Sequence, residues 1–258
     1  MRALFTAATG MDAQQIRIDT IANNLANVGT TGFKRNRAEF QDLFYETLQD
    51  PGSETSAGQI LPSGSQVGHG VALGSVSRVH AAGDRIATQR DLDLAIDGDG
   101  FFQIELPSGD LAYTRDGSFQ LGPDGALLTR TGAAVQPNLQ IPIDAQNVTI
   151  LEDGTVSVTV AGSTTPTVVG QLEVVRFANA GGLRATGGNL FEATAASGDP
   201  EVGTPGLEGF GGISQGFLES SNVNMAEELV HLILAQRAFE VNSRVIETAD
   251  EMLQRATR

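Results

Sequence analysis

The segment Gly212-Ile213-Ser214-Gln215-Gly216 carries the pattern G-x-S-x-G, in which a serine nucleophile lies on a turn between a strand and a helix. A hydrolase of this type also needs an acid and then a histidine further along the chain. Only a short stretch follows here, and His231 lies in an apolar terminal region with Glu219, Glu227 and Glu228 as the acids before it. We therefore interpret the segment as a glycine-rich turn before the last helix.

Clustered acids and histidines are further candidates for chemistry. The acids are Asp91, Asp93, Asp97 and Asp99. They do not follow the D-x-[DN]-x-[DN]-G order of a calcium loop, and no glutamate stands at the required later place. The histidines lack zinc-ligand spacing; they are His69, His80 and His231. We predict no metal site, because repeated Asp-Gly turns explain the acids better.

Other catalytic and cofactor patterns are also missing. No G-x-x-x-x-G-K-[ST] phosphate loop occurs, and the one lysine is Lys34. The glycines Gly206, Gly209 and Gly211 match a dinucleotide fingerprint poorly, and the chain has no cysteine nucleophile or ligand. The sequence therefore disfavours an enzyme, and we predict no catalytic residue and no cofactor.

The charge pattern limits the partners. Nearly all of the net charge of −15 falls on residues 41–216, and the two ends are close to neutral. An acidic body repels phosphate, so we predict no nucleic-acid partner. No apolar run approaches the roughly 20 residues of a membrane span, and the start lacks a secretory signal. We expect a chain that does not span a membrane and that leaves the cytoplasm, if it does, without a cleaved signal.

An apolar seven-residue repeat runs through each end of the chain. At the front it is Leu4, Met11, Ile18 and Leu25, with Ala7, Gln14, Ile21 and Val28 three places behind. At the back it is Met225, Leu232, Phe239, Ile246 and Leu253, with Ala235, Asn242, Ala249 and Ala256 three behind. A strict seven-residue period is typical of helices that supercoil around one another.

The front repeat predicts a helix from about Leu4 to Val28, closed by Gly29 in the left-handed conformation. The back repeat predicts a helix that starts near Asn224, whose side chain caps it while Glu227 answers the cap. Two interpretations of the pair remain: an intramolecular helical hairpin, or an assembly of copies. The assembly is favoured because the last helix is apolar on most sides, also at Val230, Ile233, Leu234, Val241 and Val245.

The region after the first helix is mixed. Phe33, Phe40, Phe44 and Leu48 follow one another at helical spacing, which favours a short second helix. Residues 50–75 are rich in Gly, Ser and Thr, which predicts an extended loop or a long hairpin.

From about residue 76 to 178 the apolar period changes to two, as at Val156, Val158 and Val160. The alternation, also present at Leu92, Leu94 and Ile96, predicts short strands. Asp-Gly between alternating runs is the usual hairpin signal, and it occurs at residues 97–98, 99–100, 116–117, 124–125 and 153–154. The segment is therefore predicted to form an antiparallel β body.

Long stretches at both ends resemble the bacterial flagellar rod and hook proteins. The N-terminal signature is Asn23-Asn24-Leu25-Ala26-Asn27-Val28-Gly29-Thr30-Thr31-Gly32-Phe33-Lys34. The C-terminal one is Gly216-Phe217-Leu218-Glu219-Ser220-Ser221-Asn222-Val223-Asn224, continued by residues 236–243 and 248–253. In the middle, residues 97–102 and 113–119 are also similar to the family. The resemblance covers nearly the whole chain, in the right order.

Within this family the chain looks most like the distal rod members. Residues 44–52 and 61–68 are similar to the insertion that marks them. Two departures are Gly29, where the family more often has Asn, and a start that is one residue shorter than usual. Gly and Asn both tolerate the left-handed conformation, so the first departure changes little.

The resemblance implies an α+β fold with a discontinuous coiled coil of the N- and C-terminal helices, a Gly-rich connecting segment and an antiparallel β outer domain. The residues predict the same partition. We place the paired terminal helices, an inner tube, at 1–29 plus 222–258. The connecting domain with its long hairpin or loop is placed at 30–80 plus 185–221, and the β domain at 81–184.

As function, the resemblance implies a structural subunit that self-assembles into a rigid helical homopolymer outside the inner membrane and transmits motor torque to the hook. The implied partners are copies of itself, proximal rod and hook proteins, basal-body ring proteins and the type III export apparatus. The implied location is the periplasm-spanning rod of the flagellar basal body. Alternatives are another axial flagellar protein, proximal rod or hook, and a secreted β-rich adhesin or enzyme with helical ends.

Two sets of residues follow for assembly. The helical interface is predicted to use Leu4, Met11, Ile18, Leu25, Asn23, Asn24, Asn27, Met225, Leu232, Phe239, Ile246 and Leu253. The segment that stiffens the polymer is predicted to use Tyr45, Leu48, Pro51, Leu61 and Pro62.

Overall fold

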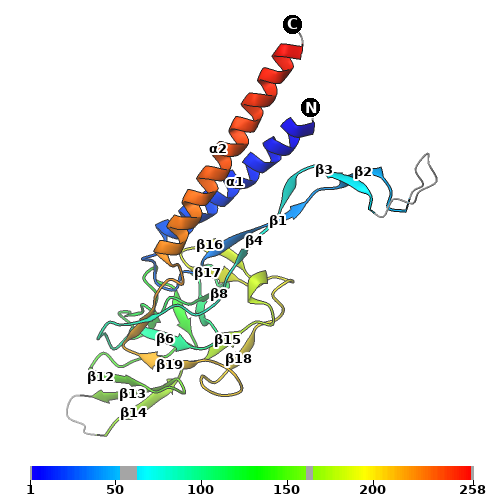
Figure 1. Cartoon of the computed structure of the whole chain (residues 1–258). Coiled ribbons are helices and arrows are strands. Elements are labelled where there is room, and N and C mark those ends of the chain that lie inside the picture. Colours follow the sequence, from blue (N-terminus) through cyan, green and yellow to red (C-terminus); the bar gives the residue numbers. More distant parts are fainter. Residues whose placement is uncertain (1, 53–62, 161–164, 257–258) are drawn as a thin grey trace. The chain divides into compact units, whose positions relative to one another are not determined.

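The computed structural model describes residues 2–52, 63–160 and 165–256 and has an α+β fold with terminal helices and antiparallel sheets (Figure 1). The chain divides into two compact units. Unit 1 comprises Met1–Ala26, Asn36–Ser77 and Asn224–Arg258. Unit 2 comprises Asn27–Arg35 and Arg78–Val223. Each unit is therefore built from segments that are far apart in the sequence.

Unit 1 contains the two predicted terminal helices, α1 (Arg2–Ala26) and α2 (Met225–Ala256), which pack side by side (Figure 1). The predicted cap of α2 is confirmed, because Asn224 Oδ1 accepts hydrogen bonds from the backbone N of Ala226 (3.1 Å) and of Glu227 (3.4 Å). Such a cap satisfies amides that the first helical turn leaves without partners.

The end of α1 differs from the expectation. The helix ends at Ala26, and the glycine with a left-handed φ of 68° is Gly32 instead of Gly29. Asn24 explains the early end, since its Oδ1 accepts from the backbone N of Asn36 and its Nδ2 donates to the Asn36 carbonyl oxygen, both at 2.8 Å. These tertiary hydrogen bonds turn the returning chain against the last helical turn.

The rest of unit 1 is a ribbon of strands. Strand β1 (Asn36–Asp42) pairs with β4 (Val71–Arg78), and β2 (Tyr45–Gln49) pairs antiparallel with β3 (Ser65–Gly68). The predicted second helix is wrong. Exposure alternates residue by residue through most of β1, and pairing with β4 overrides the helical spacing of the phenylalanines. For residues 50–75 the sequence predicts an extended loop or a long hairpin, and residues 53–62 of this segment lie outside the described residues. The described part contains β3, which pairs with β2, and the start of β4.

Unit 2 is an assembly of short strands around two clusters of buried apolar side chains. Its largest sheet has seven strands in the order β16-β17-β8-β7-β11-β10-β9, and a three-stranded sheet has the order β12-β13-β14. Two-stranded sheets pair β15 with β18, β19 with β6 and β20 with β5. All these pairings are antiparallel. The elements are β5 (Arg85–Ala87), β6 (Leu94–Asp97), β7 (Phe102–Glu105), β8 (Leu111–Thr114), β9 (Gln120–Leu121), β10 (Leu127–Leu128), β11 (Ala134–Gln136), β12 (Ala145–Ile150), β13 (Thr155–Val160), β14 (Thr167–Gln171), β15 (Val174–Arg176), the 3-10 helix η1 (Ala180–Gly182), β16 (Arg184–Gly187), β17 (Leu190–Glu192), β18 (Glu201–Gly203), β19 (Gly212–Gln215) and β20 (Phe217–Glu219).

The core of unit 2 follows from the alternating pattern. Val156 and Val158 on β13 are buried, and the residue between them is only half-buried. Phe102 on β7 is fully buried and meets Phe119 edge to face, with ring centroids 5.1 Å apart. Strand β6 breaks the alternation, because Ala95 is buried as well as its neighbours. A strand buried on both faces reads as a continuous apolar run.

The Asp-Gly hairpin signal is right at two of its five places. The pairs at 124–125 and 153–154 lie in the turns β9–β10 and β12–β13. The other three lie between consecutive strands that pair elsewhere. Gly117 has a packing reason instead, since a Cβ there would lie 1.7 Å from the carbonyl oxygen of Leu94. Glycine lets two backbones approach this closely.

Candidate functional site

The seam where α1 and α2 pack side by side buries mostly small apolar residues, although Ile21 of α1 is buried as well. Ala7 and Ala13 of α1 and Ala235 and Ala249 of α2 are buried. At Gly10 a Cβ would lie 2.8 Å from Asn242 Nδ2, so the missing side chain makes room for the amide. Small residues let two helices approach closely, and the larger side chains then flank the seam.

The large heptad residues take intermediate positions. Most of them are half-buried, namely Leu4, Met11, Ile18, Leu25, Leu232, Phe239 and Ile246. Met225 and Leu253 at the two ends of α2 are 51% and 42% exposed. Within one chain the heptad residues are therefore only partly covered by the partner helix.

The predicted asparagines have separate surroundings. Asn24 is buried in unit 1, where its Nδ2 also lies 3.4 Å from Oε1 of the buried Glu228. Asn23 Oδ1 accepts from Asn36 Nδ2 at 3.3 Å, and Asn27 Oδ1 accepts from the Thr30 hydroxyl at 3.2 Å. The structure thus gives Asn24 a role inside the chain, where its amide joins α1 to β1 and to α2.

A second apolar stripe on α2 is uncovered. Its large side chains are 40–66% exposed. Leu234 and Val241 are seven residues apart, as are Val245 and Met252, so this stripe repeats the heptad period on another side of the helix. Its members are Val230, Ile233, Leu234, Val241, Val245 and Met252. The residues that sequence analysis placed outside the first seam therefore form a surface of their own.

The hairpin β2–β3 carries another apolar surface. Phe44, Tyr45 and Leu48 are 90%, 55% and 55% exposed. Tyr45 pairs with Gly68 across the ribbon, and a Cβ on Gly68 would lie 3.3 Å from the tyrosine ring. Pro51 lies against Gly64, because a Cβ on Gly64 would lie 2.8 Å from Cδ of the proline. The predicted stiffening residues Leu61 and Pro62 lie outside the described residues.

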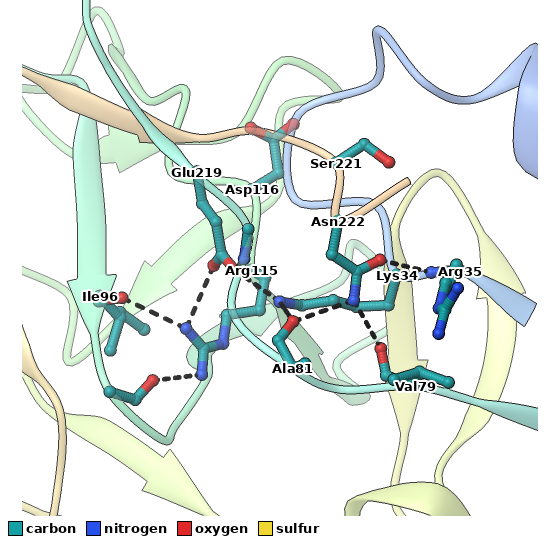
Figure 2. Close-up of polar contacts among 12 residues, drawn as sticks. Lys34, Arg35, Val79, Ala81, Ile96, Arg115, Asp116, Glu219, Ser221 and Asn222 are labelled. Carbon is teal, nitrogen blue, oxygen red and sulfur yellow. Dashed lines mark hydrogen bonds and ion pairs between the residues drawn. The ribbon is translucent and has the colours of Figure 1, made fainter. Parts of the chain in front are cut away.

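Unit 2 holds a cluster of three buried charges that the sequence analysis did not identify (Figure 2). Lys34, Arg115 and Glu219 have side chains that are at most 4% exposed. Lys34 Nζ donates to Glu219 Oε1 at 2.5 Å, and Arg115 Nη1 donates to Glu219 Oε2 at 3.1 Å. Buried charges of this kind are stable only when paired and hydrogen-bonded.

Backbone groups complete the cluster. Gly83 N donates to Glu219 Oε1 at 2.8 Å, and Lys34 Nζ donates to the Ala81 carbonyl oxygen at 2.7 Å. Arg115 Nη2 donates to the Gly98 carbonyl oxygen at 2.6 Å. Burial lowers the pKa of Lys34, and the charge of Glu219 beside it opposes that effect. The cluster therefore ties the two terminal signatures to the middle one.

His80 lies against the same region. Its ring meets Phe101 and Phe191 edge to face, each with centroids 5.7 Å apart. Burial, together with the positive charges of Lys34 and other nearby cations, lowers the pKa of His80 to about 4. The imidazole is thus neutral at neutral pH and acts as an aromatic packing group.

The sequence gives only a partial signal of this cluster. Lys34 is the only lysine of the chain and follows Phe33 directly in the N-terminal signature, and Glu219 stands in the C-terminal one. A lone lysine in an acidic chain indicates a specific partner, but the sequence does not say which of many carboxylates it meets.

The candidates for chemistry take structural places. Ser214 lies within strand β19, paired with Ala95 of β6, so the segment has no strand-to-helix turn. Asp97 is exposed and pairs with Arg85 at 2.6 Å. Among the described residues no group of three or more His, Asp or Glu could hold a metal ion. No described helix is long and apolar enough to cross a membrane.

Comparison with known proteins finds matches to the sequence over nearly the whole chain. Residues 4–34 match "Flagella basal body rod protein", residues 95–158 match "Flagellar hook protein FlgE/F/G D1 domain" and residues 214–258 match "Flagellar basal body rod FlgEFG protein C-terminal". The chain is 49% identical to flagellar basal-body rod protein FlgG of Buchnera aphidicola subsp. Acyrthosiphon pisum, over 99% of this chain and 98% of the relative. It is 50% identical to FlgG of Borreliella burgdorferi, over 98% and 96%, and 40% identical to FlgG of Bacillus subtilis, over 98% and 97%. Paired terminal helices, three matching signatures and full-length identity lead to one conclusion: the chain belongs to the family of flagellar basal-body rod proteins.

Proposed function

We propose that the chain is a structural subunit of the distal rod, and that many copies self-assemble into a rigid helical tube that transmits motor torque to the hook. The observation that carries this proposal is the uncovered apolar stripe of α2. A stripe with the period of helix packing needs a second helix surface. The partner we infer is another copy of the chain, because the family is one of rod proteins.

The burial available on docking is large enough to drive assembly. A large apolar side chain contributes roughly 1.5–3 kcal/mol when it is removed from water. The six exposed side chains of the stripe would then contribute on the order of 10 kcal/mol per subunit before ordering costs. Those costs consume much of the gain. Assembly is therefore expected to depend on concentration and on a growing tip that presents many contacts at once.

The arrangement of copies follows from the kind of contact. A head-to-tail contact that does not close into a ring generates an open helix. In this proposal the terminal helices, residues 1–29 plus 222–258, form a coiled-coil inner tube. Residues 30–80 plus 185–221 form a connecting layer, and residues 81–184 form the outer β domain. The predicted interface residues at heptad positions flank the seam from which the inner tube is built.

The remaining partners belong to the same proposal. Proximal rod and hook proteins adjoin the two ends of the tube, and basal-body ring proteins surround it. The subunit reaches the periplasm through the type III export apparatus, without a cleaved signal. Full-length identity to rod proteins supports this assignment over a secreted adhesin. The position of the protein in isolated basal bodies separates it from a proximal rod or hook role.

The hairpin β2–β3 is proposed to stiffen the tube. Its exposed Phe44, Tyr45 and Leu48 give it an apolar surface that suits contact with a neighbouring subunit. Contacts of this kind restrict the bending of a subunit against its neighbours. Torque then passes through many contacts instead of a flexible joint.

Assembly is tested by electron microscopy of concentrated purified protein, in which straight tubes are expected. The substitution Leu234→Glu places a charge in the stripe and should abolish the tubes. The matched control Gln236→Glu adds the same charge at an exposed polar position and should leave them intact. Tubes from both variants at the same concentration would contradict a role of the stripe in assembly.

Stiffening is tested by deleting residues 46–66. The shortened chain should still polymerise through its helices, but its tubes should bend more easily. Electron micrographs should therefore show a shorter persistence length. A polymer that bends no more easily than the original would contradict the stiffening role while leaving the assembly proposal in place.

A further inference from the structure

Unit 2 contains a cavity of about 200 Å³. Aromatic rings and charged or polar side chains line it, namely His80, Asp99, Phe101, Arg115, Arg176 and Phe177. Asp99 is exposed and Arg176 is half-buried, so the cavity reaches the surface on their side. Phe101 and Arg115 are buried, and Arg115 belongs to the buried charge cluster. The cavity therefore extends from the surface of unit 2 to its buried charges.

Two of the lining side chains carry a buried polar atom that has no hydrogen-bond partner. These atoms are Arg115 Nε and His80 Nδ1, which are two of the four side-chain atoms in this state among the described residues. Buried polar groups in folded proteins are almost always hydrogen-bonded, so each exception calls for an explanation, such as a bound ion or water. Two exceptions on the wall of one cavity indicate a common partner inside it.

Arg115 offers a fixed donor. Its Nη1 donates to Glu219 Oε2 at 3.1 Å and to the Ile96 carbonyl oxygen at 3.3 Å (Figure 2). Its Nη2 donates to the Gly98 carbonyl oxygen at 2.6 Å. These hydrogen bonds hold the guanidinium in place, and Nε–H is a donor in any protonation state of the protein.

His80 offers the opposite role. Its ring donates a hydrogen bond to the backbone of Ala180, a contact that favours the protonated ring by raising its pKa. Because Nδ1 is the nitrogen without a partner, the donor to Ala180 is Nε2. In the neutral ring Nδ1 is then an acceptor. A partner that suits both atoms carries an acceptor oxygen for Arg115 and an O–H group for His80.

The electrostatic potential in the cavity is positive, although the chain as a whole is acidic. Burial is the main reason that the pKa of His80 falls to about 4. The charges of Lys34, Arg78 and Arg115 lower it further. Glu219 is shared by Lys34 and Arg115 and therefore balances only one of them. The inner part of the cavity thus favours an anion.

The surface side of the cavity adds little net charge. Asp99 is the one carboxylate among the lining residues, and solvent screens an exposed charge of this kind. Arg176 has its own partner, because its Nη2 lies 2.8 Å from Glu201 Oε2. The buried cations therefore decide the potential inside the cavity.

We propose that this cavity binds a single hydrogen phosphate ion, which accepts a hydrogen bond from Arg115 Nε and donates its O–H group to His80 Nδ1. Hydrogen phosphate keeps a proton at neutral pH and therefore serves both atoms. Sulfate has a similar shape but carries no proton, so it lacks the donor that the neutral imidazole needs. All lining residues belong to unit 2, so the site is a property of this unit that goes beyond the assembly proposed above.

The test follows the His80 imidazole by NMR in dilute full-length chain. The chain has three histidines, so labelling histidine with ¹⁵N gives few signals, and the signal missing from His80→Leu is that of His80. At pH 7 inorganic phosphate should shift this signal in a saturable way, and sulfate at the same ionic strength should bind at least about tenfold more weakly. His69 and His231, which are partly exposed, report the general effect of added ions.

A matched pair of substitutions locates the ion. Ala178 is an exposed residue on the cavity wall, so Ala178→Leu narrows the cavity without removing a charge. It should abolish the response of His80 to phosphate. Ala195→Leu makes the same change at an exposed alanine that does not line the cavity, and it should keep the response.

Acid provides a second test of the proton. Protonation of the ring turns Nδ1 into a donor, so the affinity for sulfate should rise between pH 7 and pH 5, by up to about tenfold for each pH unit. An affinity for sulfate that does not change over this range would overturn the proposal. So would equal binding of the two anions at pH 7, the lack of a saturable response to phosphate, or a full response in Ala178→Leu, because each would mean an adventitious ion only or no ion at His80.

Discussion

Large apolar side chains are exposed on the second apolar stripe of α2 and buried in the core of unit 2. Phe102, Ile104 and Phe119 are fully buried in unit 2, whereas Ile233 and Leu234 on α2 are 56% and 60% exposed. Unit 2 builds a fully buried core within one chain, although some of its apolar side chains, such as Val168 (64% exposed), stay outside that core. The stripe of α2 has no comparable cover within one chain. Substitutions in the core of unit 2 are therefore expected to lower the free energy of unfolding, whereas substitutions on the stripe are expected to affect assembly.

Charged residues also differ between the two regions, being buried in unit 2 and exposed on α2. In unit 2 the pair Lys34–Glu219 is shielded from water, so its attraction is strong and its separation costly. On α2 the pair Arg237–Glu240 is 72% and 51% exposed, and exposed pairs contribute little. A change of one charge therefore has very different consequences in the two regions.

The largest expected effect is that of Glu219→Gln. The substitution leaves Lys34 and Arg115 buried without their anion, and breaking such a buried pair costs about 3–5 kcal/mol. Urea unfolding of the single chain should show this loss in the free energy of unfolding. The matched control is Glu201→Gln, whose exposed partner Arg176 lies at 2.8 Å, and it should change stability by less than about 1 kcal/mol. Equal losses in the two variants would contradict the contrast.

Acid should weaken unit 2 through His80. Its pKa is about 4 in the folded chain and 6.5 ordinarily, so between these values the unfolded state binds more protons. The free energy of unfolding therefore falls as the pH falls through this window, by about 3 kcal/mol in total. Groups facing the ring are Lys34, Arg78 and Arg115, all positive here.

The comparison with His80→Leu isolates this contribution, because carboxylates titrate in both chains. The difference in unfolding free energy between the two chains should change by that amount between pH 7 and pH 4. A constant difference across this range would show that the folded imidazole takes up its proton normally.

The sequence predicted the fold best where the local pattern and the tertiary contacts favour the same element. The terminal helices, the Asn224 cap and the valines of β13 follow from period and local chemistry, and tertiary contacts agree with them. The prediction failed for residues 33–48, where the phenylalanine spacing imitated a helix but strand pairing decided the conformation. It also failed at Gly29, because hydrogen bonds of Asn24 to Asn36, the first residue of β1, end α1 early.

Part of the candidate site could be recognised from the sequence, and part could not. The exposed stripe of α2 was recognisable, since Leu234 and Val241 lay outside the first heptad and had no cover. The cluster of Lys34, Arg115 and Glu219 was not recognisable, because it joins residues more than a hundred positions apart. Composition gives no preference among the acids of an acidic chain, so the choice of Glu219 is made only by the fold.

A smaller effect is expected at the start of α2. Asn224→Ala removes the acceptor for the Ala226 and Glu227 amides, and loss of such a cap costs about 1 kcal/mol. Hydrogen exchange should speed up at the first turn of α2 and remain unchanged in unit 2. Faster exchange throughout unit 2 would show that the helix and the β unit unfold as one, which would remove the basis of the comparison.

Leu234→Ser is expected to have the smallest effect on the stability of the single chain. It also gives the clearest test of the difference between the exposed stripe of α2 and the buried core of unit 2. The side chain is 60% exposed, so its truncation should change the free energy of unfolding by no more than about 0.5 kcal/mol. Ile104→Val, a smaller truncation, should cost about 1 kcal/mol because that side chain is fully buried. The two substitutions should rank the other way round in their effect on tube formation. Leu234→Ser should raise the critical concentration for tubes, and Ile104→Val should leave it unchanged. A stability loss at Leu234 as large as that at Ile104 would mean that the stripe is already covered within a single chain, and then no second copy would be needed to cover it.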